Sequence, residues 1–100
     1  MRICKRPRFL FDLAEELEWL KDKAGAKVAE CWYQELLAAM EELESHPQLG
    51  RQRPDLKPEG IRSWRIKRFP RWLIFYMVEN GDLIFLRVRY GMMDLPKIFE

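Results

Sequence analysis

Two stretches in the first half of the chain repeat apolar residues at the spacing of a helix. In the first stretch, four leucines share one helical face: Leu10, Leu13, Leu17 and Leu20. Acidic residues fill most of the positions between them, and Gly25 can adopt the left-handed conformation that ends a helix. The pattern predicts an amphipathic helix from about Arg8 to Gly25, with the leucines inside.

A second helix is predicted from Ala26 to Ser45. Its apolar stripe consists of Val28, Trp32, Leu36, Met40 and Leu43, and it is widened by Cys31 and Leu37. The glycine link between the helices is very short, which is typical of an antiparallel helical hairpin. Pro47 ends the second helix, because a proline pushes the preceding residue out of helical geometry.

The second half of the chain has the alternation of a sheet. Residues 46–60 hold three prolines and two glycines and predict a loop without helix or strand. Strands are expected over Ile61–Arg68, Trp72–Val78 and Leu83–Tyr90, with a bend at Phe69–Arg71. Asn80 and Gly81 tolerate the positive φ angles of a type I′ hairpin turn.

Together these elements predict an α+β fold. The short stretch 1–5 (MRICK) predicts an N-terminal strand that ends at Pro7. The helical hairpin would then pack on a small antiparallel sheet built as a three-stranded meander. Gly91 to Glu100 would form a short tail or a last extended segment, and the length of 100 residues fits a single domain over 1–100.

The positive charge gathers in the second half. Residues 1–50 carry seven Lys and Arg against ten Asp and Glu, whereas residues 51–100 carry eleven against six, although the net charge is only +2. Such polarity indicates an acidic or polyanionic partner for the basic half. No apolar run approaches the ~18 residues of a membrane span, and no signal-peptide pattern is present. We expect a cytoplasmic protein that does not bind a membrane.

Few residues can support hydrolase or metal chemistry. Cys4 and Cys31 lie far apart, and buried free thiols are favoured over a disulfide. His46 is the only histidine, which argues against a Ser-His-Asp triad or a multi-histidine metal site. No metal and no cofactor are expected.

Strand alternation would place several cations on one sheet face. If Arg65, Lys67, Arg87 and Arg89 converge there, they form a concave basic surface. Each charge-assisted contact of a guanidinium with a phosphate or carboxylate contributes about 1.5–3 kcal/mol. The alternative is a solvated face whose surface ion pairs contribute ~0–1 kcal/mol each.

The segment 60–95, GIRSWRIKRFPRWLIFYMVENGDLIFLRVRYGMMDL, resembles the C-terminal half of the RelE/ParE superfamily of bacterial type II toxins. The motifs that carry the likeness are Gly60-Ile61-Arg62, the basic bend Lys67–Arg71, Ile74-Phe75-Tyr76, the turn Glu79–Asp82 and the ending from Leu86 to Asp94. Residues 46–50 (HPQLG) also resemble the superfamily's P-x-L-G. The order of elements agrees along most of the chain.

The resemblance implies a growth-inhibiting toxin that is neutralised by a co-expressed antitoxin. RelE-like members cleave messenger RNA in the ribosome, whereas ParE-like members inhibit DNA gyrase. Here Tyr90 stands where the superfamily usually has a histidine, and Met93 replaces a late arginine. These departures favour a ParE-like, non-hydrolytic toxin that binds gyrase.

Two alternatives remain open at this point. One is a ribosome-dependent endoribonuclease, with candidate catalytic residues Arg68, Arg71, Arg87 and Tyr90. The other is an inactive toxin-fold protein that only binds an antitoxin. For the binder, the candidate target-binding residues are Arg62, Arg65, Lys67, Arg68, Arg71, Arg87 and Arg89.

All three hypotheses share one expected partner. An amphipathic, acidic antitoxin segment would lie in the groove between the helical hairpin and the sheet. Phe9, Trp19 and Trp32 are candidates to line that groove, although aromatic residues at helical spacing more often belong to the core.

Overall fold

The computed structural model describes residues 1–91. Two helices and five strands follow one another, with one 3₁₀ turn between the second helix and the second strand. Their bounds are β1 Ile3–Lys5, α1 Pro7–Ala24, α2 Ala26–Ser45, η1 Pro47–Leu49, β2 Arg51–Gln52, β3 Arg62–Ile66, β4 Phe69–Glu79 and β5 Asp82–Tyr90. The predicted tail lies, beyond Gly91, outside the described residues.

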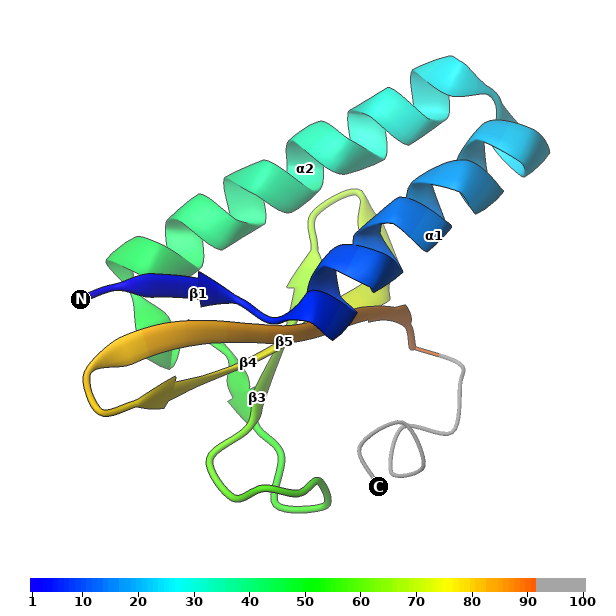
Figure 1. The fold of residues 1–100 in the computed structure, drawn as a ribbon. Helices are drawn as coiled ribbons and strands as arrows, with labels where there is room; N and C mark the ends of the chain where they lie inside the picture. The colour runs from blue at the N-terminus through cyan, green and yellow to red at the C-terminus, as the bar shows by residue number, and fades with distance from the viewer. Residues whose placement is uncertain (92–100) are drawn as a thin grey trace.

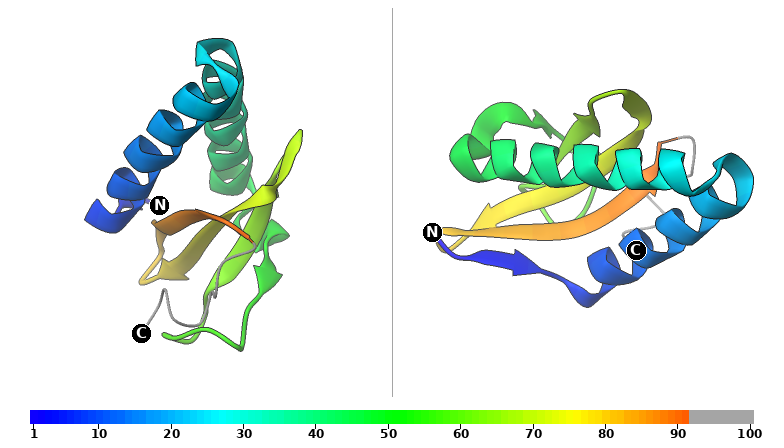
Figure 2. Two further views of the ribbon diagram at one scale, coloured as in Figure 1. Left: turned by 90° about the vertical axis from the view of Figure 1, so that its right-hand side faces the viewer. Right: turned by 90° about the horizontal axis from the view of Figure 1, so that it is seen from above.

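One mixed sheet forms the lower layer and the helical hairpin the upper layer (Figure 1). The strand order is β1-β5-β4-β3-β2, with β1 parallel to β5 and the other neighbours antiparallel. Both helices cover the same face of the sheet (Figure 2). The predicted α+β fold is therefore confirmed. The predicted loop 46–60 additionally contains η1 and β2, which are too short to leave a periodic signal.

The main core lies between the helices and the sheet. From α2 it receives Trp32, Leu36 and Leu43, all at 0% exposure. These side chains belong to one buried cluster with Tyr76 and Phe85 of the central strands. The predicted stripe of α2 is thus confirmed, apart from its first member. Val28 is 37% exposed, as is Leu37.

The buried face of α1 differs from the leucine stripe. Its buried residues are Phe9, Asp12, Glu16 and Leu20. Leu13 and Leu17 are half-buried beside the core, whereas Leu10 is 48% exposed. The prediction for Leu10 was therefore wrong. The helix is rotated so that two carboxylates, rather than a complete row of leucines, face the sheet.

A bulge in β5 changes which of its residues share a face. Tyr76 pairs with Phe85 and Phe75 pairs with Arg87, so Leu86 is an extra residue on the β5 side. Simple alternation places Phe85 and Arg87 on one face, but the extra residue reverses the alternation after Phe85. Phe85 and Val88 consequently belong to the core beneath the helices, and Arg87 lies on the opposite face.

A smaller apolar cluster lies on that opposite face. Leu56 and Ile61 pack there against Phe75, so the loop between β2 and β3 covers this part of the sheet. The loop is the green segment that extends below the sheet in Figure 1.

The Tyr76 hydroxyl on β4 holds the segment between α2 and β2 in place. Tyr76 donates a hydrogen bond to the Pro47 carbonyl (2.7 Å) and accepts one from the Gly50 amide (2.8 Å). A Cβ on Gly50 would lie 2.6 Å from Cε1 of the Tyr76 ring, so no larger residue fits without displacement. This contact sets the position at which β2 begins.

The two tight turns of the sheet differ from each other. Asn80 (φ 52°) and Gly81 (φ 78°) both have positive φ, as predicted for a type I′ turn. The turn between β3 and β4 falls at Lys67 and Arg68, earlier than the predicted bend, and Arg68 has a φ of 70°. Within residues 1–91, no helix is both long and apolar enough to cross a bilayer.

Candidate functional site

Arg87 of β5 forms a buried ion pair with Asp12 of α1. Its Nε and one terminal nitrogen donate to the two carboxylate oxygens of Asp12, at 2.6 and 3.0 Å. The two side chains are 9% and 1% exposed. Asp12 also accepts a hydrogen bond from the Val88 amide (3.2 Å). This bidentate arrangement holds α1 against the edge of β5.

Arg89 extends the same ion-pair cluster toward solvent. Its guanidinium lies 3.4 Å from Asp12 and 3.0 Å from Glu15, and its side chain is 14% exposed. Register places Arg65, Leu73 and Arg89 in one row across the sheet, as the basic-face prediction requires. However, the carboxylates of α1 already engage Arg87 and Arg89. The four predicted cations therefore do not form one open cluster.

Arg62 also makes internal contacts. It donates hydrogen bonds to the carbonyl oxygens of Gln48 (3.1 Å) and Gly50 (2.8 Å). Together with the Tyr76 hydroxyl, it fixes the segment between α2 and β2. Of the predicted target-binding residues, Arg62 thus has a structural role, as Arg87 and Arg89 do.

The exposed members of the predicted set gather around the β3–β4 turn. They are Arg65, Lys67, Arg68 and Arg71. Arg68 approaches Glu35 of α2 at 3.6 Å but remains 70% exposed, so this contact adds little stability. We call these four residues the turn cations.

The four candidate catalytic residues do not meet at one place. Arg71 donates a hydrogen bond to the Tyr90 hydroxyl (3.1 Å), so these two lie together. Arg68 lies beside α2, and Arg87 is held by Asp12. A ribonuclease needs cations and an acid or base around one phosphate. Only half of the expected group is assembled.

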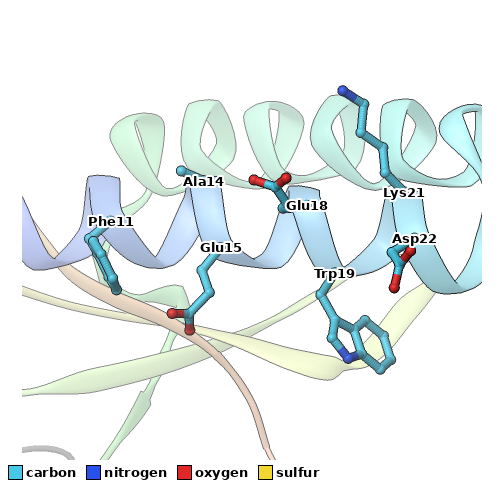
Figure 3. A pocket seen from close by; sticks show the side chains of 7 residues that line it. All are labelled: Phe11, Ala14, Glu15, Glu18, Trp19, Lys21 and Asp22. Atoms are coloured by element: carbon cyan, nitrogen blue, oxygen red, sulfur yellow. The ribbon is translucent and has the colours of Figure 1, made fainter.

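Two hollows adjoin along α1; among the described residues one is lined by α1 alone and the other also by β4 and β5. The hollows, of about 860 and 710 Å³, share Glu15 and Trp19. Figure 3 shows Phe11, Glu15 and Trp19 projecting from the same side of α1. Phe11 is 59% and Trp19 50% exposed, which is unusual for aromatic side chains of this size. We call this feature the α1 groove.

The inner end of the α1 groove is aromatic. Trp72 lies 5.0 Å from Tyr90 and 6.3 Å from Trp19, measured between ring centroids. Trp19 is therefore the only one of the three aromatic candidates that lines the groove among the described residues. Phe9 and Trp32 are fully buried and belong to the core.

Glu16 lies at the base of the α1 groove with only 9% exposure. Burial raises the pKa of its carboxyl above the ordinary value of 4.5, and the neighbouring Arg89 guanidinium opposes that rise. Sequence reasoning missed Asp12 and Glu16 because it assigned all acidic residues to the solvent face. A usable signal was present, since Phe9, Asp12, Glu16 and Leu20 also recur at helical spacing.

The fold matches that of a known class of protein. A solved structure described as the chromosomal ParDE TA system from P. aeruginosa superposes with a TM-score of 0.75. It covers 90% of this chain and 95% of its own, at 18% identity, and at that level the likeness shows the fold alone. The hairpin on a mixed sheet is thus the fold of RelE/ParE-type toxins, as the sequence resemblance implied.

Sequence comparison narrows the class to one family. The family model described as the ParE toxin of the type II toxin-antitoxin system, parDE, matches residues 5–95. Toxin ParE3 of Caulobacter vibrioides is 34% identical over 71 residues, which cover 71% of this chain and 67% of that protein. The chain belongs to the ParE toxin family of type II toxin–antitoxin systems, and the expected ParE-like branch is confirmed.

Proposed function

We propose that this ParE-family toxin inhibits growth by binding DNA gyrase and that a cognate antitoxin neutralises it. The observation that carries the proposal over RNA cleavage is the burial of Arg87 against Asp12. An arginine that is 9% exposed and held by both oxygens of a carboxylate is not available to a phosphate. A protein-binding activity needs no such catalytic group.

The turn cations are the proposed gyrase-binding surface. Lys67 and Arg71 are exposed, and the strand pairs Ile66–Phe69 and Arg65–Leu73 flank them. Exposed cations on a rigid hairpin suit an acidic protein surface, since complementary charge speeds encounter and fixes orientation. The remaining predicted contacts, Arg62, Arg87 and Arg89, would support the fold rather than touch the target.

The α1 groove is the proposed antitoxin site. Its two exposed aromatic side chains, Phe11 and Trp19, offer anchors for the apolar face of an amphipathic segment. Arg71, at the inner end, offers a partner for an acidic residue of that segment. Such binding would add to the free energy of unfolding, because the antitoxin would bind only the folded toxin.

A supercoiling assay with purified gyrase tests the proposal. The toxin should block supercoiling at micromolar concentration, and a variant carrying Lys67→Glu and Arg71→Glu should lose inhibition by about tenfold or more. Lys27→Glu, on the exposed surface of α2, is the matched control and should inhibit as the wild type does. The small acidic protein encoded beside the toxin should restore supercoiling. Failure of the wild type to inhibit gyrase would reject the proposal.

The contact between Arg71 and Tyr90 keeps RNA cleavage as the second candidate. A cation and a phenol within hydrogen-bond distance could act together on a phosphodiester. Toe-printing of translated messenger RNA distinguishes the two activities. New cleavage ends that disappear with Arg71→Ala would favour the ribonuclease. If neither activity is found and induction leaves growth intact, the chain only binds an antitoxin.

A further inference from the structure

The inner end of the α1 groove is a hollow of about 710 Å³ that takes its lining from three elements. Trp19 of α1, Trp72 of β4 and Tyr90 of β5 supply aromatic rings. Glu16, which is 9% exposed, supplies a carboxyl. The volume is within the usual range for ligand sites, roughly 300–1,000 Å³. We call this feature the inner hollow.

The ion-pair cluster beside the inner hollow leaves one carboxylate unmatched. Among the described residues, Arg87 pairs with Asp12, and Arg89 pairs with Asp12 and Glu15. Glu16, the third carboxylate on this side of α1, has neither an ion pair nor a hydrogen bond of normal length to any residue in 1–91. It is therefore the group of the cluster that can still accept a cation.

Glu16 is already desolvated before any ligand arrives. Burial raises the pKa of its carboxyl, and the opposing effects of the Arg89 guanidinium and the Trp72 indole do not cancel that rise. Removing a charged group from water is the main penalty in forming a buried ion pair. At Glu16 the folded toxin carries that penalty alone, so an incoming cation adds only its own share.

The aromatic walls favour a cation in the same place. The ring centroids of Trp72 and Tyr90 are 5.0 Å apart at 71°, and those of Trp72 and Trp19 are 6.3 Å apart at 56°. Rings at such angles form adjoining walls rather than a stack. Trp19 is 50% exposed, so its ring is accessible from solvent. Aromatic faces attract ammonium and guanidinium groups, more strongly where water is excluded.

The inside of the inner hollow and its surface differ in charge. Arg71 is exposed and donates a hydrogen bond to the Tyr90 hydroxyl (3.1 Å), whereas Glu16 is buried. An isolated cation would be repelled by Arg71 on its way in. A basic side chain with an acidic neighbour in the same segment matches both charges, since the acidic group can stay outside with Arg71.

We propose that the inner hollow binds a lysine or arginine side chain of the antitoxin segment, with its cationic group on Glu16 and its aliphatic stem against Trp19 and Trp72. Long basic side chains commonly bury their stems along apolar surfaces in this way. The identity of the partner rests on the proposed antitoxin site. The preference for a cation does not, and small cations can test it separately.

Nuclear magnetic resonance of the ¹⁵N-labelled full chain tests the preference. The probes are n-butylammonium and n-butylguanidinium, with n-butanol as the neutral analogue, and the indole N–H signals of Trp19 and Trp72 are followed. Both cations should shift these signals in a saturable manner and bind about fivefold or more tightly than n-butanol.

A matched pair of variants assigns that preference to Glu16. Glu16→Gln should weaken cation binding by about fivefold or more and leave the affinity for n-butanol within about twofold of wild type. Glu44→Gln, exposed near the end of α2, removes the same charge and should change neither affinity by more than about twofold. Thermal melts show that both variants are folded.

The pH dependence of cation binding provides a second measurement. The described charged and titratable groups around Glu16 come from α1, β4 and β5: Asp12, Glu15, Arg71, Arg89 and Tyr90. Because the cation needs an ionised Glu16, affinity should rise between about pH 4 and pH 7 and then level off. In Glu16→Gln this rise should be absent, which separates Glu16 from the other carboxylates.

The proposal is overturned if neither cation binds, if n-butanol binds as tightly as the cations do, if Glu16→Gln keeps the wild-type affinity, or if affinity falls as pH rises. Calorimetry with the small acidic protein encoded beside the toxin tests the partner. Glu16→Gln should weaken that complex by about tenfold, and Glu44→Gln by less than about twofold. A complex that Glu16→Gln does not weaken overturns the inference alone, whereas no complex at all rejects the proposed antitoxin site.

Discussion

Two pairs of arginines on one face of the sheet differ in whether a carboxylate binds them. Arg87 and Arg89, on β5, are engaged by the carboxylates of α1 and contribute to holding the helix in place. Arg51 and Arg65, on β2 and β3, have no carboxylate within ion-pair distance in the described part of the chain. The residue type and the strand face are the same in both groups. The presence of acidic residues on the neighbouring element therefore decides whether an arginine stabilises the fold or stays exposed to solvent.

Removal of Asp12 should produce the largest effect on stability. Asp12→Ala leaves Arg87 buried without its main partner, and breaking a buried pair from one side costs about 3–5 kcal/mol. Urea unfolding followed by circular dichroism measures the change. Arg65→Ala, on the same face but exposed, should change the free energy of unfolding by less than about 0.5 kcal/mol. Equal losses in the two variants would abolish the distinction between the groups.

A smaller loss is expected when the segment that leads to Arg51 is released. Tyr76→Phe removes the hydroxyl that bonds the Pro47 carbonyl and the Gly50 amide, and leaves both groups without that partner. The cost should be about 1–3 kcal/mol. Tyr90→Phe, whose hydroxyl accepts a bond from the exposed Arg71, is the control and should lose less. If the two phenylalanine variants have the same melting temperature, the Tyr76 hydroxyl does not hold this segment in place.

The smallest effect on stability is expected from Glu16, and it depends on pH. The pKa of Glu16 is raised by burial, so the folded state holds its proton more tightly than the unfolded state does. This contribution to stability is complete below the unfolded pKa and is lost as pH rises through the folded pKa. Glu16→Gln has no such titration. The variant should therefore gain stability relative to wild type between pH 4 and pH 7, measured as a difference in melting temperature.

Glu18→Gln provides the control for that pH profile, because Glu18 is exposed on the same helix. Its difference from wild type should stay nearly constant over the same range. A Glu16→Gln profile that runs parallel to the Glu18→Gln profile would show that Glu16 titrates like a surface carboxyl.

The sequence predicts best what neighbours in the chain determine. The turn at Asn80 and Gly81 was confirmed because only a few residues tolerate positive φ at both positions. The stripe of α2 was largely confirmed because one wide apolar face leaves a single way to pack the helix. Family motifs in the sheet carried the toxin assignment, which the family match confirms.

The predictions that failed concern contacts between residues far apart in the chain. Asp12 and Arg87 are 75 positions apart, and neither local pattern shows that a carboxylate and a guanidinium will be buried together. The extra residue in β5 reversed the predicted faces after Phe85, and no proline or glycine marks that bulge. Strand β2 was missed because its two residues lie in a segment rich in proline and glycine.

The hydrogen bond from the Val88 amide to Asp12 also bears on self-association. Beyond the three residues that pair with β1, the outer margin of β5 could accept another extended chain. The Asp12 carboxylate already accepts a hydrogen bond from the Val88 amide, which such a chain would need. The added chain would first have to displace Asp12 from its ion pair with Arg87. This hydrogen bond therefore disfavours edge-to-edge polymerisation along β5. An added strand would have to pair at the opposite edge of the sheet, where β2 offers only two residues.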